Sequence, residues 1–146
     1  MSTILDFLSA YHRACDNLFA AAEEAVAQQH WDSARNLFDR FRITMERHLA
    51  MEEQVLFPAF EERTGNTVGP TRIMRMEHEQ MRALMNNMEA AVASGNDASY
   101  LGLSETLNML TQQHNLKEES MLYPMSDRVL AASRDKLIRN MDALAP

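Results

Sequence analysis

One eleven-residue pattern occurs twice in this chain. Residues 48–58 read HLAMEEQVLFP and residues 114–124 read HNLKEESMLYP, so both follow H-x-x-x-E-E-x-x-L-aromatic-P at an offset of 66 residues. His12 and His78 keep the same offset, so four of the five histidines form two copies of one unit, H-x35-H-x3-E. Two helix pairs related by a pseudo-twofold axis are the simplest structure that this repeat predicts.

Apolar residues recur every three and four positions through most of the sequence, which is the helical period. The repeat units span about 3–62 and about 70–125, and each contains two long helices. We expect Asp32 or Ser33 to cap the second helix, Pro70 to open the third, and Asp97 or Ser99 to start the fourth. Pro58 is expected to bend its helix or to begin its end.

Short connections make consecutive long helices antiparallel. The predicted fold is therefore all-α: an up-down-up-down four-helix bundle with an extra C-terminal helix over about 133–144. A chain of 146 residues fits one domain, spanning 1–146.

Composition narrows the functional classes. The net charge of −7 disfavours nucleic-acid binding, which needs clustered lysine and arginine, and it disfavours binding to anionic membranes. No segment approaches the roughly 20 apolar residues of a membrane-spanning helix. The single cysteine, Cys15, excludes an intramolecular disulfide. We expect a cytoplasmic protein that is a monomer or a weak homo-oligomer, with no nucleic-acid and no membrane partner.

Histidine and glutamate four positions apart share one face of a helix. His48 and Glu52 can therefore point into one cavity, as can His114 and Glu118. A four-helix bundle could bring them together with the histidines of the other two helices, and such bundles hold paired iron or manganese. The predicted metal ligands are His12, His48, Glu52, His78, His114 and Glu118.

The donor count suits two metal ions. Two imidazoles for each metal, two bridging carboxylates and one bridging oxide or hydroxide give five ligands for each, with one position left for a small molecule. Nitrogen and carboxylate donors without thiolate favour iron or manganese, although zinc and copper also accept them.

Other polar residues near the motifs have simpler interpretations. A single H-x-x-x-E is usually a surface pair, and only the repetition in register argues against that here. Glu53 and Glu119 are expected on the exposed face, with contact to the ligands as the lesser alternative. Packing is the default role for Tyr11, Glu77 and Tyr123.

The motifs resemble those of the hemerythrin-like, or HHE cation-binding, family. The resemblance rests on His12, on HLAMEEQVLFP at 48–58, on EHEQMRALM at 77–85 and on HNLKEESMLYP at 114–124. It implies a four-helix bundle with a non-haem centre of two iron ions, of the Fe–O–Fe type, held by the six residues above. Manganese or zinc are possible substitutes for the iron.

Two departures from oxygen-carrying hemerythrins stand out. Arg82 occupies the position four after His78, where the carriers have a further histidine, and helix four has H-x-x-x-E in place of H-x-x-x-x-D. These departures disfavour a reversible oxygen carrier. The resemblance instead implies a di-iron protein that binds or reacts with oxygen, nitric oxide or peroxide in sensing, buffering or stress protection. The alternatives are a di-iron redox enzyme (peroxidase-like, catalase-like or nitric-oxide reductase), an oxygen carrier, and a helical interaction module without metal. Whether the protein is an enzyme stays open.

Overall fold

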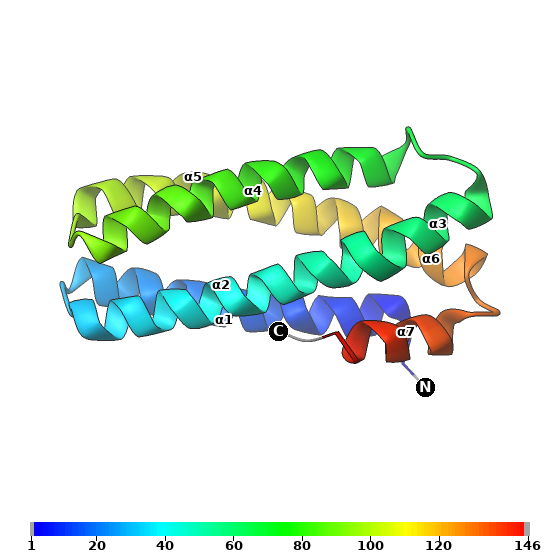
Figure 1. Ribbon diagram of the computed structural model, residues 1–146, viewed down its shortest axis with the longest axis horizontal. Helices are drawn as coiled ribbons and strands as arrows, with labels where there is room; N and C mark the ends of the chain where they lie inside the picture. The colour runs from blue at the N-terminus through cyan, green and yellow to red at the C-terminus, as the bar shows by residue number, and fades with distance from the viewer. Residues whose placement is uncertain (1, 145–146) are drawn as a thin grey trace.

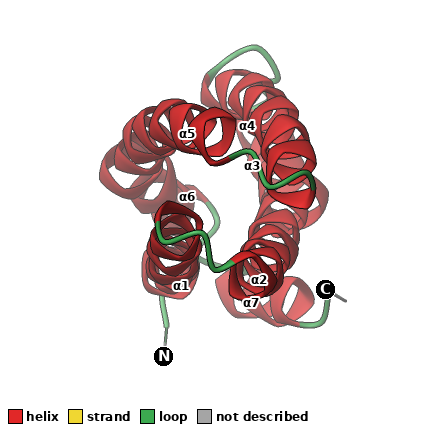
Figure 2. Cartoon of the chain, turned by 90° about the vertical axis from the view of Figure 1, so that its left-hand side faces the viewer, coloured by secondary structure: helices red, strands yellow, loops and turns green. Residues whose placement is uncertain are grey.

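The computed structural model describes residues 2–144, and within that range every regular element is a helix (Figure 1). The four long helices are α1 (Ile4–Ala27), α2 (Trp31–Met51), α4 (Pro70–Ala93) and α5 (Asp97–Lys117). Helix α1 packs against α2 and α5, and α4 packs against α5 and α2, so the helices surround a common axis (Figure 2). The predicted all-α bundle is confirmed.

The long helices of each repeat continue through a π-helical turn. Helix α2 runs into η1 (Glu52–Leu56) and then α3 (Phe57–Thr64), while α5 runs into η2 (Glu118–Leu122) and then α6 (Tyr123–Val129). Each π-helical turn ends one residue before the dipeptide that contains proline, Phe57-Pro58 or Tyr123-Pro124. A proline ring lacks an N–H and clashes with the carbonyl four residues earlier in a regular α-helix, and a wider turn before the proline gives this carbonyl more room. Pro58 was expected to bend the helix or to begin its end; the helix instead widens locally at η1 and continues to Thr64.

The helix starts differ slightly from the predicted caps. Helix α2 begins at Trp31, with His30 at the capping position, and His30 makes no side-chain capping bond, so the predicted caps at Asp32 and Ser33 are wrong. Helix α5 begins at Asp97, one of the two predicted starts, and Asn96 caps it, since its side chain accepts a hydrogen bond of 3.1 Å from the Ser99 amide. Pro70 opens α4 as predicted.

The apolar core forms two clusters along the bundle. One contains residues of α1 and α2 between Cys15 and Leu49 and of α4 and α5 between Met81 and Leu107, and it is rich in phenylalanine and methionine. The other joins η1, η2, α3, α6 and the start of α1. On each long helix, the histidines and glutamates of the repeat fall in sequence between members of the two clusters. A band of polar side chains is thus enclosed by apolar packing on both sides.

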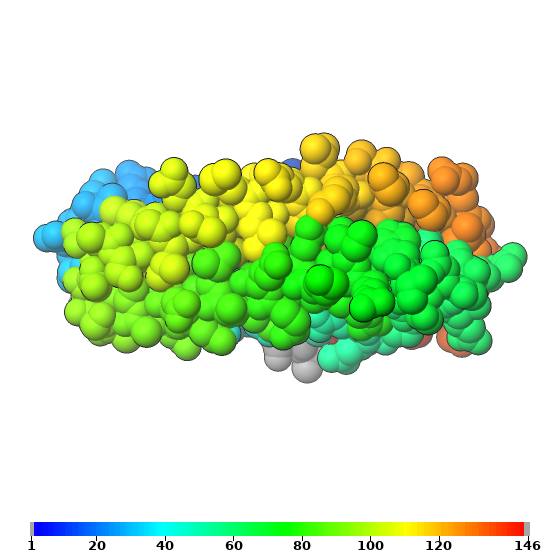
Figure 3. Space-filling view, turned by 90° about the horizontal axis from the view of Figure 1, so that it is seen from above, coloured from blue at the N-terminus to red at the C-terminus, as the bar shows by residue number. Residues whose placement is uncertain are grey.

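The C-terminal helix α7 (Arg134–Asp142) lies against η1 and α1 at one end of the bundle, as Figure 1 shows. Asp127 ties this end together, because its carboxylate accepts hydrogen bonds from the amides of Ile4 and Leu5. On the opposite face, α4 and α5 form most of the surface (Figure 3). Among the described residues, no helix is long and apolar enough to cross a membrane.

Candidate metal centre

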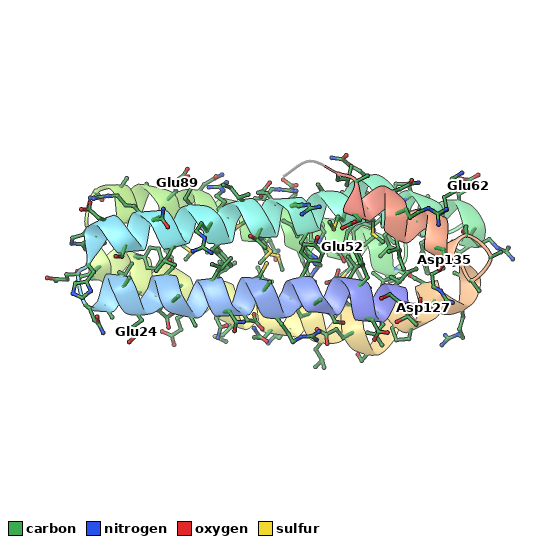
Figure 4. The ribbon with its side chains drawn as sticks, turned by 90° about the horizontal axis from the view of Figure 1, so that it is seen from below. Glu24, Glu52, Glu62, Glu89, Asp127 and Asp135 are labelled. Carbon is green, nitrogen blue, oxygen red and sulfur yellow. The ribbon has the colours of Figure 1, made fainter. Side chains whose placement is uncertain are left out.

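Six buried side chains meet inside the bundle, and they are the six residues predicted from the repeat. They come from six different elements: His12 from α1, His48 from α2, Glu52 from η1, His78 from α4, His114 from α5 and Glu118 from η2. None is more than 5% exposed. Figure 4 shows Glu52 between the helices, whereas Glu24 and Glu89 lie at the periphery.

The cluster divides into two overlapping groups. Within each group, one ligand atom from every residue lies within 4.8 Å of those from the others. The His78–His114 group contains Glu52, His78, His114 and Glu118. The His12–His48 group contains His12, His48 and Glu118. Glu118 belongs to both groups, so its carboxylate is shared between the two sets of candidate ligands.

The distances between donor atoms suit metal coordination. His12 Nε2 lies 3.0 Å from Glu118 Oε1, His78 Nε2 lies 3.1 Å from Glu52 Oε1, and His114 Nε2 lies 3.2 Å from Glu118 Oε2. Ligands bound at about 2.1 Å from a metal, at right angles to one another, are separated by about 3 Å. The observed spacing is therefore that of neighbouring ligands around one ion.

Several of these atoms are buried and lack a hydrogen-bond partner. They include both ring nitrogens of His48, Nε2 of His78 and His114, Oε1 of Glu52 and Oε2 of Glu118. A buried polar atom without a partner costs roughly 1–3 kcal/mol, and so many in one place are exceptional. Bound cations would satisfy all of these atoms except His48 Nδ1, because His48 faces the glutamates with Nε2. The residues present therefore fit a metal centre.

Three carboxylates outside the cluster orient the histidines. His12 Nδ1 lies 2.6 Å from Glu119 Oε2, His78 Nδ1 lies 2.7 Å from Glu53 Oε2, and His114 Nδ1 lies 2.8 Å from Glu77 Oε1. An ionised carboxylate only accepts hydrogen bonds, so Nδ1 carries the proton and donates it in each pair. In the neutral imidazole the lone pair of Nε2 then faces the cluster, and this is the tautomer that binds a metal.

The simpler interpretations of these carboxylates were wrong. Glu53 and Glu119 are not merely surface residues, because each contacts a histidine of the opposite repeat. Glu77 likewise does more than pack. The doubled glutamate in each motif was the only signal in the sequence, and it does not specify which histidine is contacted.

Tyr123 also enters the cluster. Its hydroxyl lies 2.7 Å from Glu52 Oε2, 2.9 Å from Glu118 Oε1 and 3.2 Å from His12 Nε2. The equivalent residue of the first repeat, Phe57, has no hydroxyl and stacks on the ring of His78. The two ends of the cluster therefore differ in polarity.

His12 and His78 favour protonation when no metal is present. Burial opposes the charged imidazole, but the carboxylates of Glu118 and Glu119 outweigh it and raise the pKa of His12 to about 9. Glu52 and Glu53 likewise outweigh burial and raise the pKa of His78 to about 9.

The two buried glutamates respond in opposite directions. Burial, together with the negative charge of Glu118, raises the pKa of Glu52. Burial alone would raise the pKa of Glu118 too, but hydrogen bonding from Glu52 and the positive charge of His114 hold it well below the usual value. In the metal-free protein, Glu52 is thus the carboxyl that takes up a proton more readily, and Glu118 is the one that stays ionised more readily.

The chain is an antiparallel helical bundle, and its paired H-x-x-x-E segments meet at the centre. These two features are those of metal-binding helical bundles. The family described as the hemerythrin HHE cation-binding domain matches residues 3–126, and the chain belongs to this family. Helix α7 lies beyond the matched range.

A curated relative is the iron-sulfur cluster repair protein YtfE of Edwardsiella ictaluri (strain 93-146). It is 31% identical to this chain over 96 residues, which cover 59% of the chain and 43% of the relative. Less than half of that protein's length is therefore matched. No solved structure matches the chain.

Proposed function

We propose that this chain is a non-haem di-iron protein that binds a small molecule, such as oxygen, nitric oxide or peroxide, in sensing, buffering or stress protection. The observation that carries the proposal is the buried cluster of four imidazoles and two carboxylates, divided into two groups that share Glu118. Membership of the cation-binding family and the repair function named for the relative from Edwardsiella support the same class.

The donor atoms support iron or manganese. The two groups hold nitrogen and carboxylate oxygen donors. Cys15 is buried and its thiol pKa is raised to about 12 by burial and by Asp16, so it stays protonated at neutral pH. A pair of irons, once bound, supplies one-electron chemistry and open coordination positions for diatomic ligands.

The residues of this chain would hold the irons, orient the imidazoles and exclude water. The four imidazoles are the proposed terminal ligands, and Glu118 is the proposed bridge, with Glu52 as a second bridge because His48 Nε2 lies 3.5 Å from its Oε1. The outer carboxylates hold the imidazoles in the binding tautomer. Apolar packing on both sides excludes bulk water from the cluster.

Anaerobic reconstitution with ferrous iron tests the proposal. Two irons per chain are expected, with near-ultraviolet absorption appearing on admission of oxygen. His48→Ala and Glu118→Ala are expected to lose both features, while a control at the peripheral Glu62, Glu62→Gln, keeps them. Absence of stoichiometric iron from the wild-type protein would overturn the proposal.

A second candidate is a redox enzyme that reduces peroxide or nitric oxide. The hydroxyl of Tyr123 favours it, because burial and the two nearby carboxylates raise its pKa well above the usual value and keep its proton in place beside the cluster. Steady-state turnover with peroxide or nitric oxide, diminished in Tyr123→Phe, distinguishes an enzyme from a binding protein.

A further inference from the structure

The two histidine groups differ in how the carboxylates that accept from their Nδ1 atoms are held in place. In the His78–His114 group, Glu53 accepts from His78 on one side and from Arg82 on the other. Arg82 Nη1 lies 2.8 Å from Glu53 Oε2, and Nη2 lies 2.9 Å from Oε1. Such a two-point contact is among the strongest side-chain interactions. The Glu53 side chain is accordingly only 21% exposed.

The second histidine of the same group is held in a similar way. Glu77 accepts from His114 Nδ1 and forms an ion pair with Lys117. Its side chain is 16% exposed. Both imidazoles of this group are therefore fixed by a carboxylate that is itself fixed by a cation.

The equivalent positions of the first repeat lack these cations. Glu119 contacts His12, but its side chain is 42% exposed and has no lysine or arginine partner within residues 2–144. Sixty-six residues before Arg82 the chain has Asp16, which is an acid in place of the cation.

His48 has neither a carboxylate nor a cation. Its Nδ1 is buried without a hydrogen-bond partner. The residue equivalent to Glu77 is Tyr11, whose ring centroid lies 6.0 Å from that of His48, and the residue equivalent to Lys117 is the buried Met51. Nothing in the described part of the chain fixes the orientation of this ring by a hydrogen bond.

Orientation of this kind contributes directly to metal affinity. A carboxylate partner fixes the tautomer and the ring angle and makes the imidazole more basic, and its loss typically lowers metal affinity by about 10–100-fold. Glu52 also lies nearer to the His78–His114 group, since its Oε1 is 3.1 Å from His78 Nε2 and 3.5 Å from His48 Nε2. Both differences act in the same direction.

We infer that the two metal positions are unequal: Arg82 and Lys117, through Glu53 and Glu77, make the His78–His114 position tight, and the His12–His48 position exchanges its metal readily. The inference rests on the proposed function, since it requires two bound metals. Arg82 and Lys117 act as positioning residues, because they reach the imidazoles only through carboxylates.

Matched histidine variants test the inequality. His12→Ala and His78→Ala remove equivalent residues of the two repeats, and circular dichroism verifies that each variant is folded. Under anaerobic titration with ferrous iron, His12→Ala is expected to retain one tightly bound metal per chain. His78→Ala is expected to lose the tightly bound metal, so that only weakly bound metal remains. Equal losses in the two variants, or the reverse pattern, would overturn the inference.

Milder variants address the same question without removing a ligand. Glu53→Gln is expected to lower the affinity for the tightly bound metal by about 10–100-fold. Its equivalent, Glu119→Gln, is expected to lower only the affinity for the weakly bound metal. Asp16→Arg introduces a cation near Glu119 and is expected to raise the affinity for the weakly bound metal. If Glu53→Gln and Glu119→Gln change the affinity for the same metal equally, the assignment is wrong.

Removal of iron from the wild-type protein by a chelator gives a direct kinetic readout. Two phases of equal amplitude, separated by about tenfold or more in rate, are expected from the cost of a lost carboxylate partner. A single phase that releases both metals would overturn the inequality while leaving the di-iron proposal intact. A wild-type protein without bound iron would overturn both.

Discussion

The hydroxyl of Tyr123 lies 2.9 Å from the carboxylate of Glu118, five residues earlier in the same continuous helix. In a regular α-helix, residues five apart point about 140° away from each other. The π-helical turn η2 reduces this difference, because its hydrogen bonds join residues five apart, as the amide of Tyr123 does with the Glu118 carbonyl. A backbone irregularity thus brings a phenol to the proposed metal centre.

Replacing the tyrosine by the residue of the other repeat isolates the hydroxyl. In Tyr123→Phe, the metal-free protein is expected to lose about 1–3 kcal/mol of unfolding free energy, because buried carboxylates lose a donor. Metal stoichiometry is expected to stay at the wild-type value, since neither proposed position depends on the phenol as a ligand. Urea unfolding and metal analysis check both points, with Phe57→Tyr as the mirror variant. Loss of a metal in Tyr123→Phe would assign the phenol as a ligand instead.

Metal removal is expected to destabilise the protein. A ligand that binds only the folded state at 100 times its Kd adds about 2.7 kcal/mol. For a domain of this size that corresponds to about 5–10 °C in Tm. Calorimetry before and after chelation measures the difference. An unchanged Tm after complete removal would favour a purely structural role for the histidines and glutamates.

The stability of the metal-free protein is expected to fall on both sides of a weakly acidic optimum. The folded pKa of His12 and His78, about 9, lies above the ordinary 6.5, so their contribution is complete below pH 6.5 and is lost as the pH rises to 9. Glu53 has its pKa lowered from 4.5 to about 2, despite burial, by His78 and Arg82, so its contribution is lost as the pH falls through that range. Glu52, with a raised pKa, adds to the alkaline loss.

Metal reverses the alkaline part of this profile. Bound metal requires deprotonated Nε2 atoms, so affinity rises as protons cease to compete. The stabilisation by metal is therefore expected to be larger at pH 9 than at pH 6. Urea unfolding of both forms across this range provides the measurement, and parallel profiles would contradict the pKa assignments.

Removing one buried charge is expected to separate stability from binding. Glu52→Gln eliminates the repulsion from Glu118, so the metal-free variant is expected to unfold at higher urea than the wild type above pH 7. The same change removes a proposed ligand and is expected to reduce bound iron. Glu62→Gln, at the periphery of the bundle (Figure 4), serves as the control. A less stable metal-free Glu52→Gln would show that hydrogen bonds to Glu52 outweigh the repulsion.

The sequence predicted the central cluster well because its signal is local. Within one helix, a spacing of four fixes the common direction of His48 and Glu52 whatever the rest of the chain does. The repeat then placed the second pair by the same rule. The start of α2 was less accurate, since residues such as Asp32 are favourable both as a cap and within the first turn of a helix.

What the sequence by itself determined is the all-helical bundle and the six histidines and glutamates that converge in it, because both follow from periodicity along single helices. Only the tertiary structure decided which outer carboxylate meets which histidine, since Glu119 reaches His12 across a distance of 107 residues in sequence. It also decided that Arg82 and Lys117 support one half of the cluster and that Tyr123 enters it. Those contacts depend on the rotation of neighbouring helices and on the two π-helical turns, and the pattern of residues along one helix contains neither.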